Sequence, residues 1–386
     1  MRLLSYKRIC VVTATRAEYG LLKPLIQRLT DDPDVVLDLV VTGTHLSSEF
    51  GLTYQAIEED GFQIDRKLDI LLSSDKPSSI SKTMGLALMS FADYFATNSY
   101  DYLVVLGDRY EILAVCQAAM HERIPIAHIH GGETTEGAVD EGIRHAITKL
   151  SHLHFTSTST YRDRVIQLGE SPERVFNLGA LGVENSLNES LYSKKELEHA
   201  LGVDLSKPYV LVTYHPVTLE GETSEHVKSL LEVCANRQDL LFIFTKANAD
   251  AYGREINRLL EAYVENHHNA VLFDSLGLKR YLSAMQYATC VMGNSSSGII
   301  EAPSFGIPTI NIGDRQKGRL QADSVINCSP VPSAIHKALS YALEESYQAF
   351  AKQAINPYGH GKTSHAIVSY LKQTTVSLQK TFYDIR

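Results

Sequence analysis

Residues 287–301 read YATCVMGNSSSGIIE, an apolar stretch followed by a small polar turn and a second apolar run. This order predicts a buried strand, a tight turn and a helix that opens at the turn. The layout is typical of phosphate sites in α/β proteins, because free backbone N–H groups at a helix N-terminus point at an anion. The alternative is a plain serine-rich N-cap.

Polar side chains around this turn favour a nucleotide as the ligand. Ser295, Ser296 and Ser297 can add hydroxyl donors, and Arg315 can add a planar charged fork. Glu301 suits a pair of sugar hydroxyls better than a phosphate. A diphosphate and a ribose together indicate a nucleotide. If the turn is instead a plain serine-rich N-cap, Arg315 is simply a solvated side chain.

Similar strand–helix alternation extends over the whole chain. Near-continuous apolar strands separated by helical patterns indicate parallel sheets covered on both faces, which is an α/β fold class. The expected strands are 9–13, 35–42, 102–106, 124–129 and 152–156, then 209–213, 240–245, 270–273, 290–292 and 309–312. Helical spacing occurs at 21–29, 51–59, 80–95 and 111–120, and again at 362–378.

The length of 386 residues fits two domains better than one core. A break with two glycines falls near 179–188, where we expect a hinge. We therefore predict two Rossmann-like domains, 1–181 and 182–361, facing each other across a cleft, with a C-terminal helical segment at 362–386.

Composition excludes several classes of function. The net charge is −9, with 44% hydrophobic and 21% charged residues, and no basic tract compensates for the acidity, so a nucleic-acid partner is not expected. The five cysteines are scattered without metal-ligand spacing, which favours buried thiols in a reducing compartment. No signal peptide or membrane span is recognisable, so we expect a cytoplasmic protein.

Ligands of open parallel sheets bind beyond the carboxyl ends of the strands. The loops at those ends carry polar side chains throughout this chain, which makes them the expected site. They are 14–20, 43–45, 107–109, 130–133, 214–216, 246–248 and the serine-rich turn.

Two of these loops hold carboxylates suited to proton transfer. Asp108 and Arg109 follow an apolar strand, where Asp108 is either a buried acid or base or a helix N-cap with Glu111 completing a capping box. Residues 128–146 read HIHGGETTEGAVDEGIRHA, in which Glu133 and Asp140 add further carboxylates. The alternating histidines share a strand face, but no third ligand has metal spacing, so we predict no metal site.

Other loop residues suit an anionic partner. Arg16 lies in a strand-to-helix loop without G-x-G-x-x-G, so a dinucleotide cofactor is not supported. His215 comes at the end of the first strand of the second domain, where it contacts a diphosphate or is only a structural loop histidine. Asn248 follows the next strand, where it binds the ligand or only caps a helix. His45 lies in the loop after the second strand and is also a candidate for substrate binding.

Seven segments in order resemble the UDP-N-acetylglucosamine 2-epimerase family, and most closely its hydrolysing branch, which feeds sialic acid synthesis. They are TATRAEYG, VTGTHLS, VLGDRYE, HIHGGETTEGAVDEGIRHAITK, YHPVT, GNSSSGIIE and NIGDRQKGR. The resemblance implies a glycosyltransferase-B-like fold, an active site between the domains and a C-terminal helix that crosses back to the first domain. It also implies a homodimer or homotetramer and requires no metal or cofactor.

The resemblance assigns roles to individual residues of this chain. The UDP site maps onto Arg16, His215, Asn248, Ser295, Ser296, Glu301 and Arg315, and the acid/base carboxylates map onto Asp108 and Asp140. Members of the wider family often carry a glutamate where this chain has His130. Either His130 takes that role or Glu133, three residues on, supplies it.

The implied reaction has two stages. A base removes the proton at carbon 2 while the bond from carbon 1 to UDP breaks, which gives a 2-acetamidoglucal. Water then adds with inversion at carbon 2 and N-acetylmannosamine leaves. Charge at Arg109, Arg315 and His215 would stabilise the leaving diphosphate.

Four other functions remain open. The first is hydrolysis and epimerisation of a UDP-linked 2,4-diacetamido-2,4,6-trideoxy sugar on the legionaminic acid route, although the HIHGGE segment favours N-acetylglucosamine. The second is non-hydrolysing epimerisation, whose enzymes tend to keep a glutamate where this chain has His130. The third is a glycosyltransferase of the same architecture, but the carboxylates of segment 130–141 favour elimination over transfer. The fourth is a non-catalytic nucleotide-sugar sensor, against which Asp108, Glu133 and Asp140 argue.

Overall fold

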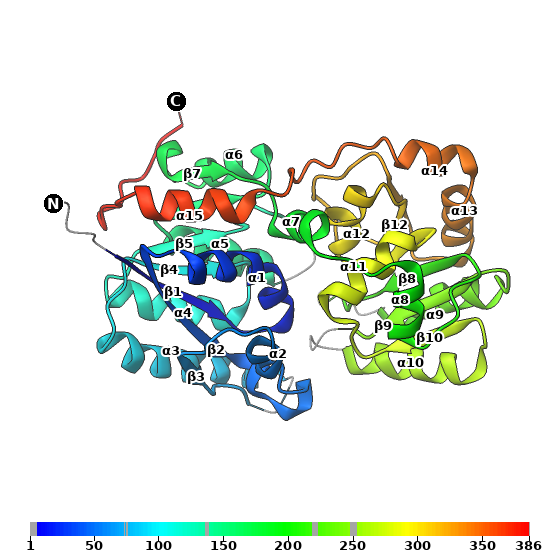
Figure 1. The fold of residues 1–386 in the computed structure, drawn as a ribbon, viewed down its shortest axis with the longest axis horizontal. Helices are drawn as coiled ribbons and strands as arrows, with labels where there is room; N and C mark the ends of the chain where they lie inside the picture. The colour runs from blue at the N-terminus through cyan, green and yellow to red at the C-terminus, as the bar shows by residue number, and fades with distance from the viewer. Residues whose placement is uncertain are drawn as a thin grey trace. The chain divides into compact units, whose positions relative to one another are not determined.

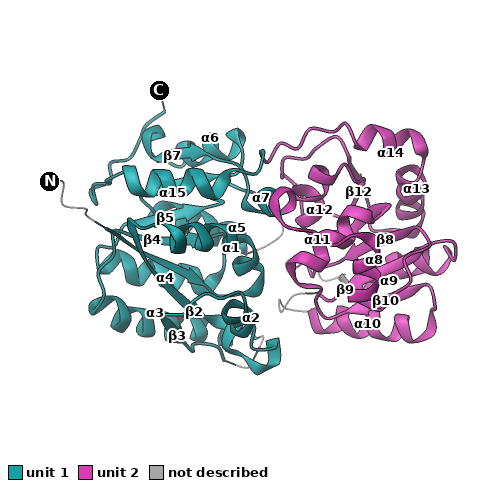
Figure 2. Cartoon of the chain, viewed as in Figure 1, with its two compact units in different colours: residues 1–133, 140–185, 359–386 teal, residues 134–139, 186–358 magenta. Residues whose placement is uncertain are grey.

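The computed structural model describes residues 6–72, 74, 76–135, 139–217, 223–247 and 253–385. The chain forms two compact α/β units, shown in different colours in Figure 2. Unit 1 comprises residues 1–133, 140–185 and 359–386, and unit 2 comprises 134–139 and 186–358. The domain boundaries predicted from the sequence lie after residues 181 and 361, whereas the boundaries between the units lie after residues 185 and 358.

Unit 1 is built on a seven-stranded sheet in the order β3-β2-β1-β4-β5-β6-β7, in which every neighbouring pair is parallel. Its strands are β1 Lys7–Thr13, β2 Val35–Thr42, β3 Arg66–Leu68, β4 Tyr102–Leu106, β5 Ile126–Ile129, β6 Leu153–Thr156 and β7 Val175–Asn177. Its helices are α1 Arg16–Asp31, α2 Tyr54–Glu59, α3 Pro77–Ala96, α4 Tyr110–His121, α5 Asp140–Leu150, α6 Ser159–Gln167 and α15 Thr363–Gln373. Helix α7, Leu181–Asn188, spans the boundary between the units.

Unit 2 has a six-stranded parallel sheet in the order β10-β9-β8-β11-β12-β13. The strands are β8 Tyr209–Thr213, β9 Leu241–Thr245, β10 Ala270–Phe273, β11 Cys290–Gly293, β12 Thr309–Ile312 and β13 Val325–Cys328. The helices are α8 Lys194–Leu201, α9 Thr223–Ala235, α10 Gly253–Asn266, α11 Gly277–Tyr287, α12 Ser297–Ile300, α13 Pro332–Ala342 and α14 Glu345–Ala351.

Each sheet is covered on both faces, as near-continuous apolar strands predict. In unit 1, Val11 and Ile9 pack with Leu22 of α1 and Ile367 of α15, whereas the opposite face packs on α3 and α4. In unit 2, α9, α10 and α13 pack on one face and α8 and α11 on the other. This arrangement confirms the predicted α/β class with two parallel sheets.

Strand order changes direction beside β1 in unit 1 and beside β8 in unit 2, since β1 lies between β2 and β4 and β8 lies between β9 and β11. Such switch points leave a crevice beyond the carboxyl ends of the strands. The predicted site loops after β1, β4, β8 and β11 all follow strands that border these points.

The C-terminal segment returns to unit 1, where α15 lies along α1 (Figure 1). Lys372 of α15 bonds Asp32 and Asp34 at 2.8 Å, and the Tyr102 hydroxyl donates to the Thr374 carbonyl at 2.7 Å. The helix was expected to reach residue 378 but ends at Gln373. Two β-branched threonines follow, and such residues have low helix propensity.

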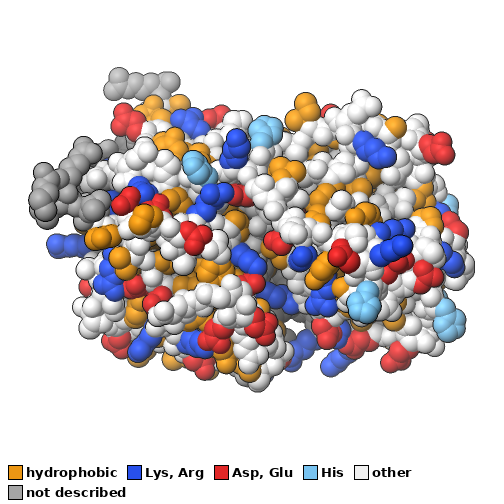
Figure 3. Space-filling view, in the orientation of Figure 1, with side chains coloured by type: hydrophobic (Ala, Val, Ile, Leu, Met, Phe, Trp, Pro, Cys, Tyr) orange, Lys and Arg blue, Asp and Glu red, His pale blue; other side chains and the backbone are white. Residues whose placement is uncertain are grey.

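No helix among the described residues is long and apolar enough to cross a membrane. Figure 3 shows positive and negative side chains interspersed over the visible face, without a broad field of one sign. An anionic ligand is therefore expected to depend on a few placed cations.

Candidate functional site

The segment after β11, which we call the serine turn (residues 293–298), begins at a glycine that no other residue could replace without strain. Gly293 has a φ of +134°, and a Cβ at this position would collide with the Thr213 carbonyl oxygen of β8. The close approach brings the end of β11 against the end of β8, and His215 lies in the loop two residues beyond Thr213. Helix α12, which follows, has 4 residues.

Ser296 stands at the N-cap position of α12, yet its side chain makes no capping hydrogen bond. That observation disfavours the plain N-cap as the reason for this serine. Ser295 lies one residue earlier, and its hydroxyl accepts a long hydrogen bond of 3.4 Å from the Ser297 N–H. Glu301 follows α12 and is 9% exposed.

Arg315 and His215 are brought to the serine turn through one residue, Asn294. The Arg315 guanidinium donates to the Asn294 carbonyl at 3.2 Å, and the Gln316 amide donates to the same oxygen at 2.8 Å. The Asn294 side chain bonds the backbone of His215. Unit 2 therefore joins four of its five described candidates, Ser295, Ser296, His215 and Arg315, around one turn, with Glu301 just beyond it.

Asn248 lies outside the described residues, so its role in binding stays a prediction.

In unit 1, the carboxylate of Asp108 forms an ion pair with Arg144 of α5. Helix α4 begins at Tyr110 with Arg109 in the N-cap position, and Glu111 pairs with Arg109 at 3.3 Å. Asp108 therefore does not belong to the capping box that the sequence left open. The carboxylate is the partner of a buried guanidinium.

Arg144 is 1% exposed and joins three segments. Besides Asp108, its guanidinium bonds the Glu133 carbonyl oxygen at 2.7 Å and the Glu141 carboxylate at 2.9 Å. Burial acts to lower the pKa of Arg144, but the charges of Asp108, Glu133 and Glu141 outweigh it and raise that pKa. The side chain stays charged and ties the loops after β4 and β5 to α5.

His130 and Glu133, the two candidates for one catalytic role, lie against each other. The His130 Nδ1 atom is 3.3 Å from Glu133 Oε1, and the same oxygen accepts a 2.8 Å hydrogen bond from Ser157. Both side chains are buried, and His130 has a φ of +67°, which is uncommon for a residue with a Cβ. The two candidates therefore lie within ion-pair distance of each other, at the end of β5.

His128, by contrast, is part of the framework. Its Nε2 bonds the Gly107 carbonyl at 2.7 Å, directly before Asp108, and its Nδ1 lies 3.3 Å from the Thr148 hydroxyl. Burial lowers the pKa of His128 to about 3, so the ring is neutral at physiological pH. It positions the loop that carries Asp108.

The other predicted residues of unit 1 are spread along its sheet. Asp140 is the first residue of α5, one turn before Arg144, and Arg16 is an exposed first residue of α1. His45 is fully buried, and its two ring nitrogens lie 3.1 Å and 2.8 Å from the hydroxyls of Thr13 and Thr53. Burial lowers the pKa of His45 to about 4. This geometry favours a structural role for His45, and its substrate contact stays a prediction.

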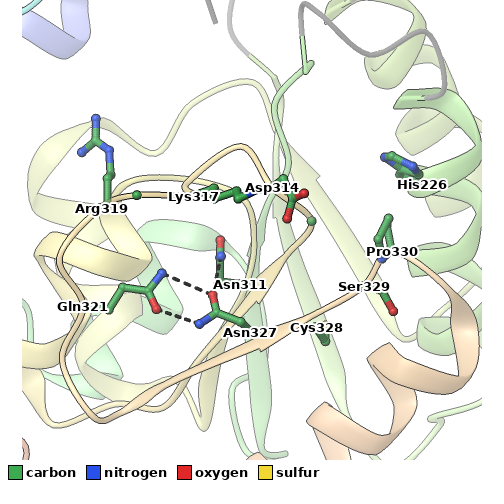
Figure 4. A pocket seen from close by; sticks show the side chains of 12 residues that line it. His226, Asn311, Asp314, Lys317, Arg319, Gln321, Asn327, Cys328, Ser329 and Pro330 are labelled. Atoms are coloured by element: carbon green, nitrogen blue, oxygen red, sulfur yellow. Dashed lines mark hydrogen bonds between the residues drawn. The ribbon is translucent and has the colours of Figure 1, made fainter. Parts of the chain in front are cut away.

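A polar pocket of about 950 Å³ lies in unit 2 beyond the ends of β12 and β13 (Figure 4). Asn311, Asn327 and Gln321 form a chain of side-chain amides along one wall, with an Asn311 to Asn327 bond of 2.7 Å. Asp314 and Lys317, which lie one and two residues from Arg315 in the sequence, also line the pocket. No residue of the serine turn lines this pocket.

Among the described residues, no group of three or more His, Cys, Asp or Glu side chains is arranged to hold a metal ion.

The sequence profile of the UDP-N-acetylglucosamine 2-epimerase family matches residues 27–372. The chain belongs to this family.

Two curated relatives resemble this chain over most of its length, and the first, whose name includes the hydrolysing reaction, agrees with the hydrolysing branch of the family. A GDP/UDP-N,N'-diacetylbacillosamine 2-epimerase (hydrolyzing) of Campylobacter jejuni is 48% identical over 326 residues, which cover 84% of this chain and 85% of the relative. Polysialic acid biosynthesis protein P7 of Escherichia coli is 41% identical over 386 residues, which cover 98% of both chains.

Among solved structures, a UDP-N-acetylglucosamine 2-epimerase of Neisseria meningitidis, crystallised with UDP-N-acetylglucosamine, superposes with a TM-score of 0.81. It is 20% identical, and the match covers 95% of this chain and 100% of that chain. The likeness agrees with the glycosyltransferase-B-like fold expected of this epimerase.

Sequence reasoning missed three residues of the site. Arg144, Asn294 and Gln316 are each at most 1% exposed and hold other candidates in place. All three lie inside the segments that carry the family resemblance, but arginine, asparagine and glutamine are mostly exposed in proteins, so the sequence did not mark them as buried. The signal that marks these polar side chains as part of the candidate site is their burial, which only the fold reveals.

Proposed function

We propose that this protein is a hydrolysing 2-epimerase of a UDP-linked 2-acetamido sugar. The observation that carries the proposal is the buried Arg144, which gathers Asp108, Glu141 and the Glu133 backbone at the ends of β4 and β5. Epimerisation at carbon 2 needs a carboxylate whose position and charge are controlled, because the proton it removes is weakly acidic. Arg144 supplies both kinds of control.

In the proposed mechanism, Asp108, Asp140 and the His130–Glu133 pair divide the acid and base roles. One of them takes the carbon 2 proton while the bond from carbon 1 to the UDP oxygen breaks, and the electron pair of the C–H bond forms the double bond of the glucal. Water then adds its hydroxyl at carbon 1, and a proton returns to carbon 2 on the opposite face. The net change is one water consumed, with the free 2-epimeric sugar and UDP released.

The residues around the serine turn would hold the departing UDP. Ser295 and Ser296 supply hydroxyl donors, and Arg315, held at the turn by Asn294, supplies fixed positive charge. Charge that is in place before the bond breaks stabilises the leaving group without reorganisation. Arg16, His215, Asn248 and Glu301 complete the proposed UDP site, with Glu301 on the ribose hydroxyls.

For the sugar, UDP-N,N'-diacetylbacillosamine is our first candidate, because the 48% identical relative is named for that sugar. UDP-N-acetylglucosamine is the second candidate. It is favoured by His130 in the HIHGGE segment and by the polysialic acid relative, which matches 98% of the chain.

A cytoplasmic homodimer or homotetramer is also proposed from the family resemblance, and sedimentation velocity would measure the oligomeric state.

Proton NMR in deuterated water tests the reaction and both sugars together. The protein is incubated with each UDP-sugar separately and then with both at equal concentration. Released UDP and a free 2-epimeric sugar with deuterium at carbon 2 are expected, at a higher rate with the diacetamido substrate. A faster reaction of UDP-N-acetylglucosamine would reverse the order of the candidates. Sugar that remains linked to UDP would refute hydrolysis, and no turnover of either substrate would refute the proposed function.

A further inference from the structure

Asn294 is fully buried at the point where β11 ends, and both its side chain and its backbone are engaged. The register of β8 and β11 pairs Gly293 with Thr213, and the Asn294 N–H still donates to the Thr213 carbonyl at 3.2 Å. Beyond that bond, the backbone of β11 turns away into the serine turn.

The Asn294 side chain continues the ladder that its backbone leaves. Its Oδ1 accepts from the His215 N–H at 2.6 Å, and its Nδ2 donates to the His215 carbonyl at 2.8 Å. A side-chain amide carries the same donor and acceptor as a peptide group, so it can pair with a strand in place of backbone. Aspartate lacks the donor, and glutamine is one methylene longer. Asparagine is therefore the residue that fits this position.

The backbone carbonyl of Asn294 serves the third segment of the proposed UDP site. It accepts from the Arg315 guanidinium at 3.2 Å and from the Gln316 amide at 2.8 Å. Gln316 is 1% exposed, so this bond is shielded from water. One residue thus connects the loop after β8, the serine turn and the loop after β12.

We propose that Asn294, supported by Gln316, is the positioning residue of the diphosphate site. It sets the spacing between His215, the serine hydroxyls and Arg315, so that all three meet the same pair of phosphates. The proposal rests on the proposed function, because it takes UDP as the ligand of this site. Asn294 acts through its neighbours, and its loss should weaken contacts to the phosphates but not to the uridine.

The test compares the binding of UDP and uridine, measured by calorimetry for UDP and by NMR titration for uridine. Asn294→Ala removes the side-chain pairing with His215. Gln316→Met removes one hydrogen bond to the Asn294 carbonyl at nearly constant side-chain volume. This second variant still tests the proposal should Asn294→Ala fail to fold. Asn269→Ala is the matched control, since Asn269 is a buried asparagine of the same unit that bonds the Cys234 and Arg237 carbonyls before β10.

We expect the UDP dissociation constant to rise about ten-fold in Asn294→Ala and about three-fold in Gln316→Met, the range for one or two lost hydrogen bonds. The uridine dissociation constant should stay unchanged in both variants, and the control should bind both ligands normally. In the double variant the effects should combine to less than their product, because both changes release the same turn.

Three results would overturn the proposal. Unchanged UDP binding in both folded variants would remove Asn294 and Gln316 from the positioning of the site. Equal losses for UDP and uridine, or a similar loss in Asn269→Ala, would show a general structural effect. Failure of the unchanged protein to bind UDP would refute the proposed nucleotide site itself, and the positioning role with it, which distinguishes the two failures.

Discussion

Arg144 is the residue on which the carboxylate cluster depends. Its planar guanidinium meets Asp108, Glu141 and the Glu133 carbonyl at once, a geometry that the single ammonium of lysine cannot reproduce. Arg144→Lys keeps the charge but should lower kcat/KM by about 100-fold, the effect of misplacing a catalytic group by about 1 Å.

Arg144→Met should in addition destabilise the fold by about 3–5 kcal/mol, because it leaves buried partners without their counter-charge. Initial rates of UDP release and urea unfolding measure the two effects. Arg237→Lys, which alters the Arg237–Asp239 pair at 2.7 Å, is the control and should change neither. Full activity in Arg144→Lys would refute the positioning of Asp108 by Arg144.

Asp108 is expected to transfer a proton. Asp108→Asn keeps the size of the side chain and removes its basicity, so turnover should fall by at least about 100-fold, the usual contribution of a general acid or base. The UDP dissociation constant should remain near normal, because the predicted UDP ligands are other residues. Single-turnover kinetics and calorimetry measure the two quantities. Weakened UDP binding with substantial turnover would assign Asp108 to binding instead.

Glu18 should make the stability of the protein depend on pH. Its carboxylate accepts from the Ala14 and Thr15 N–H groups at 2.8 and 2.9 Å and closes a capping box on α1. Burial, assisted by the charge of Glu111, raises the pKa of Glu18 to about 8 from an ordinary value of 4.5. Between these values the folded chain holds a proton that the unfolded chain has lost, so this contribution to stability falls as pH rises from about 5 to 8.

The glutamine of Glu18→Gln cannot ionise. The free energy of unfolding of this variant should therefore rise relative to that of the unchanged protein as pH rises through this window. Urea unfolding at pH 5, 6.5 and 8 measures the difference. Glu196→Gln is the matched control, because Glu196 closes the same kind of capping box on α8 but is exposed and its pKa is lowered. A difference for Glu18→Gln that stays constant with pH would contradict the protonated state.

At the scale of elements, α15 depends on a carboxylate from another helix. Glu184 of α7 is 2% exposed and accepts from both the N–H and the hydroxyl of Ser364 at 2.6 Å, which satisfies the first turn of α15. Arg28 of α1 donates to the same hydroxyl at 2.7 Å. The C-terminal helix is therefore attached to unit 1 at its beginning.

Glu184→Ala should destabilise this attachment by about 1–3 kcal/mol, the cost of leaving buried donors unpaired. Hydrogen exchange should then accelerate in the amides of α15 while α13, which packs elsewhere, serves as the internal control. Glu184→Gln keeps an acceptor and should show a smaller change. Equal exchange in α15 for all three proteins would show that packing alone holds the helix.

Elements also differ in how well the sequence predicts them. The central strands were predicted because they are buried on both faces and read as apolar runs, such as Tyr102–Leu106. The strands that were missed, β3, β7 and β13, are each the outermost strand of a sheet. Edge strands are short and partly exposed, so Arg66–Leu68 carries no apolar pattern.

At the scale of the molecule, the two units carry different parts of the proposed chemistry. The carboxylate cluster lies in unit 1 and the residues around the serine turn lie in unit 2. UDP lacks the reacting sugar, so it should stabilise the protein mainly through unit 2. At a concentration of about 100 times its dissociation constant, UDP should add about 2.7 kcal/mol to the free energy of unfolding.

Hydrogen exchange with and without UDP locates this stabilisation. Amides of residues 293–300 and 312–319 should exchange more slowly, and those of α6 in unit 1, which carries none of the predicted UDP ligands, should not change. ADP at the same concentration is the control for the nucleobase. Equal protection by ADP would show a phosphate site without selection for uridine, and no protection at the serine turn would place UDP elsewhere.

The sequence by itself determined the α/β class and the two parallel sheets, and it predicted which loops would carry the chemistry. These follow from local patterns, because a doubly covered strand must be apolar and the polar residues that follow it mark the carboxyl edge of the sheet. Ser295, Asp108 and Glu133 were predicted as site residues in this way.

Only the tertiary structure decided how those residues are held. Whether Asp108 caps a helix or meets a buried arginine depends on α5, which follows it by some thirty residues in the chain. Asn294 pairs with His215, which is 79 residues away in the sequence. The buried His45 ring lies within hydrogen-bond distance of the Thr13 and Thr53 hydroxyls. Burial and hydrogen-bond partners of polar side chains arise from contacts between distant segments, which no local pattern of residues contains.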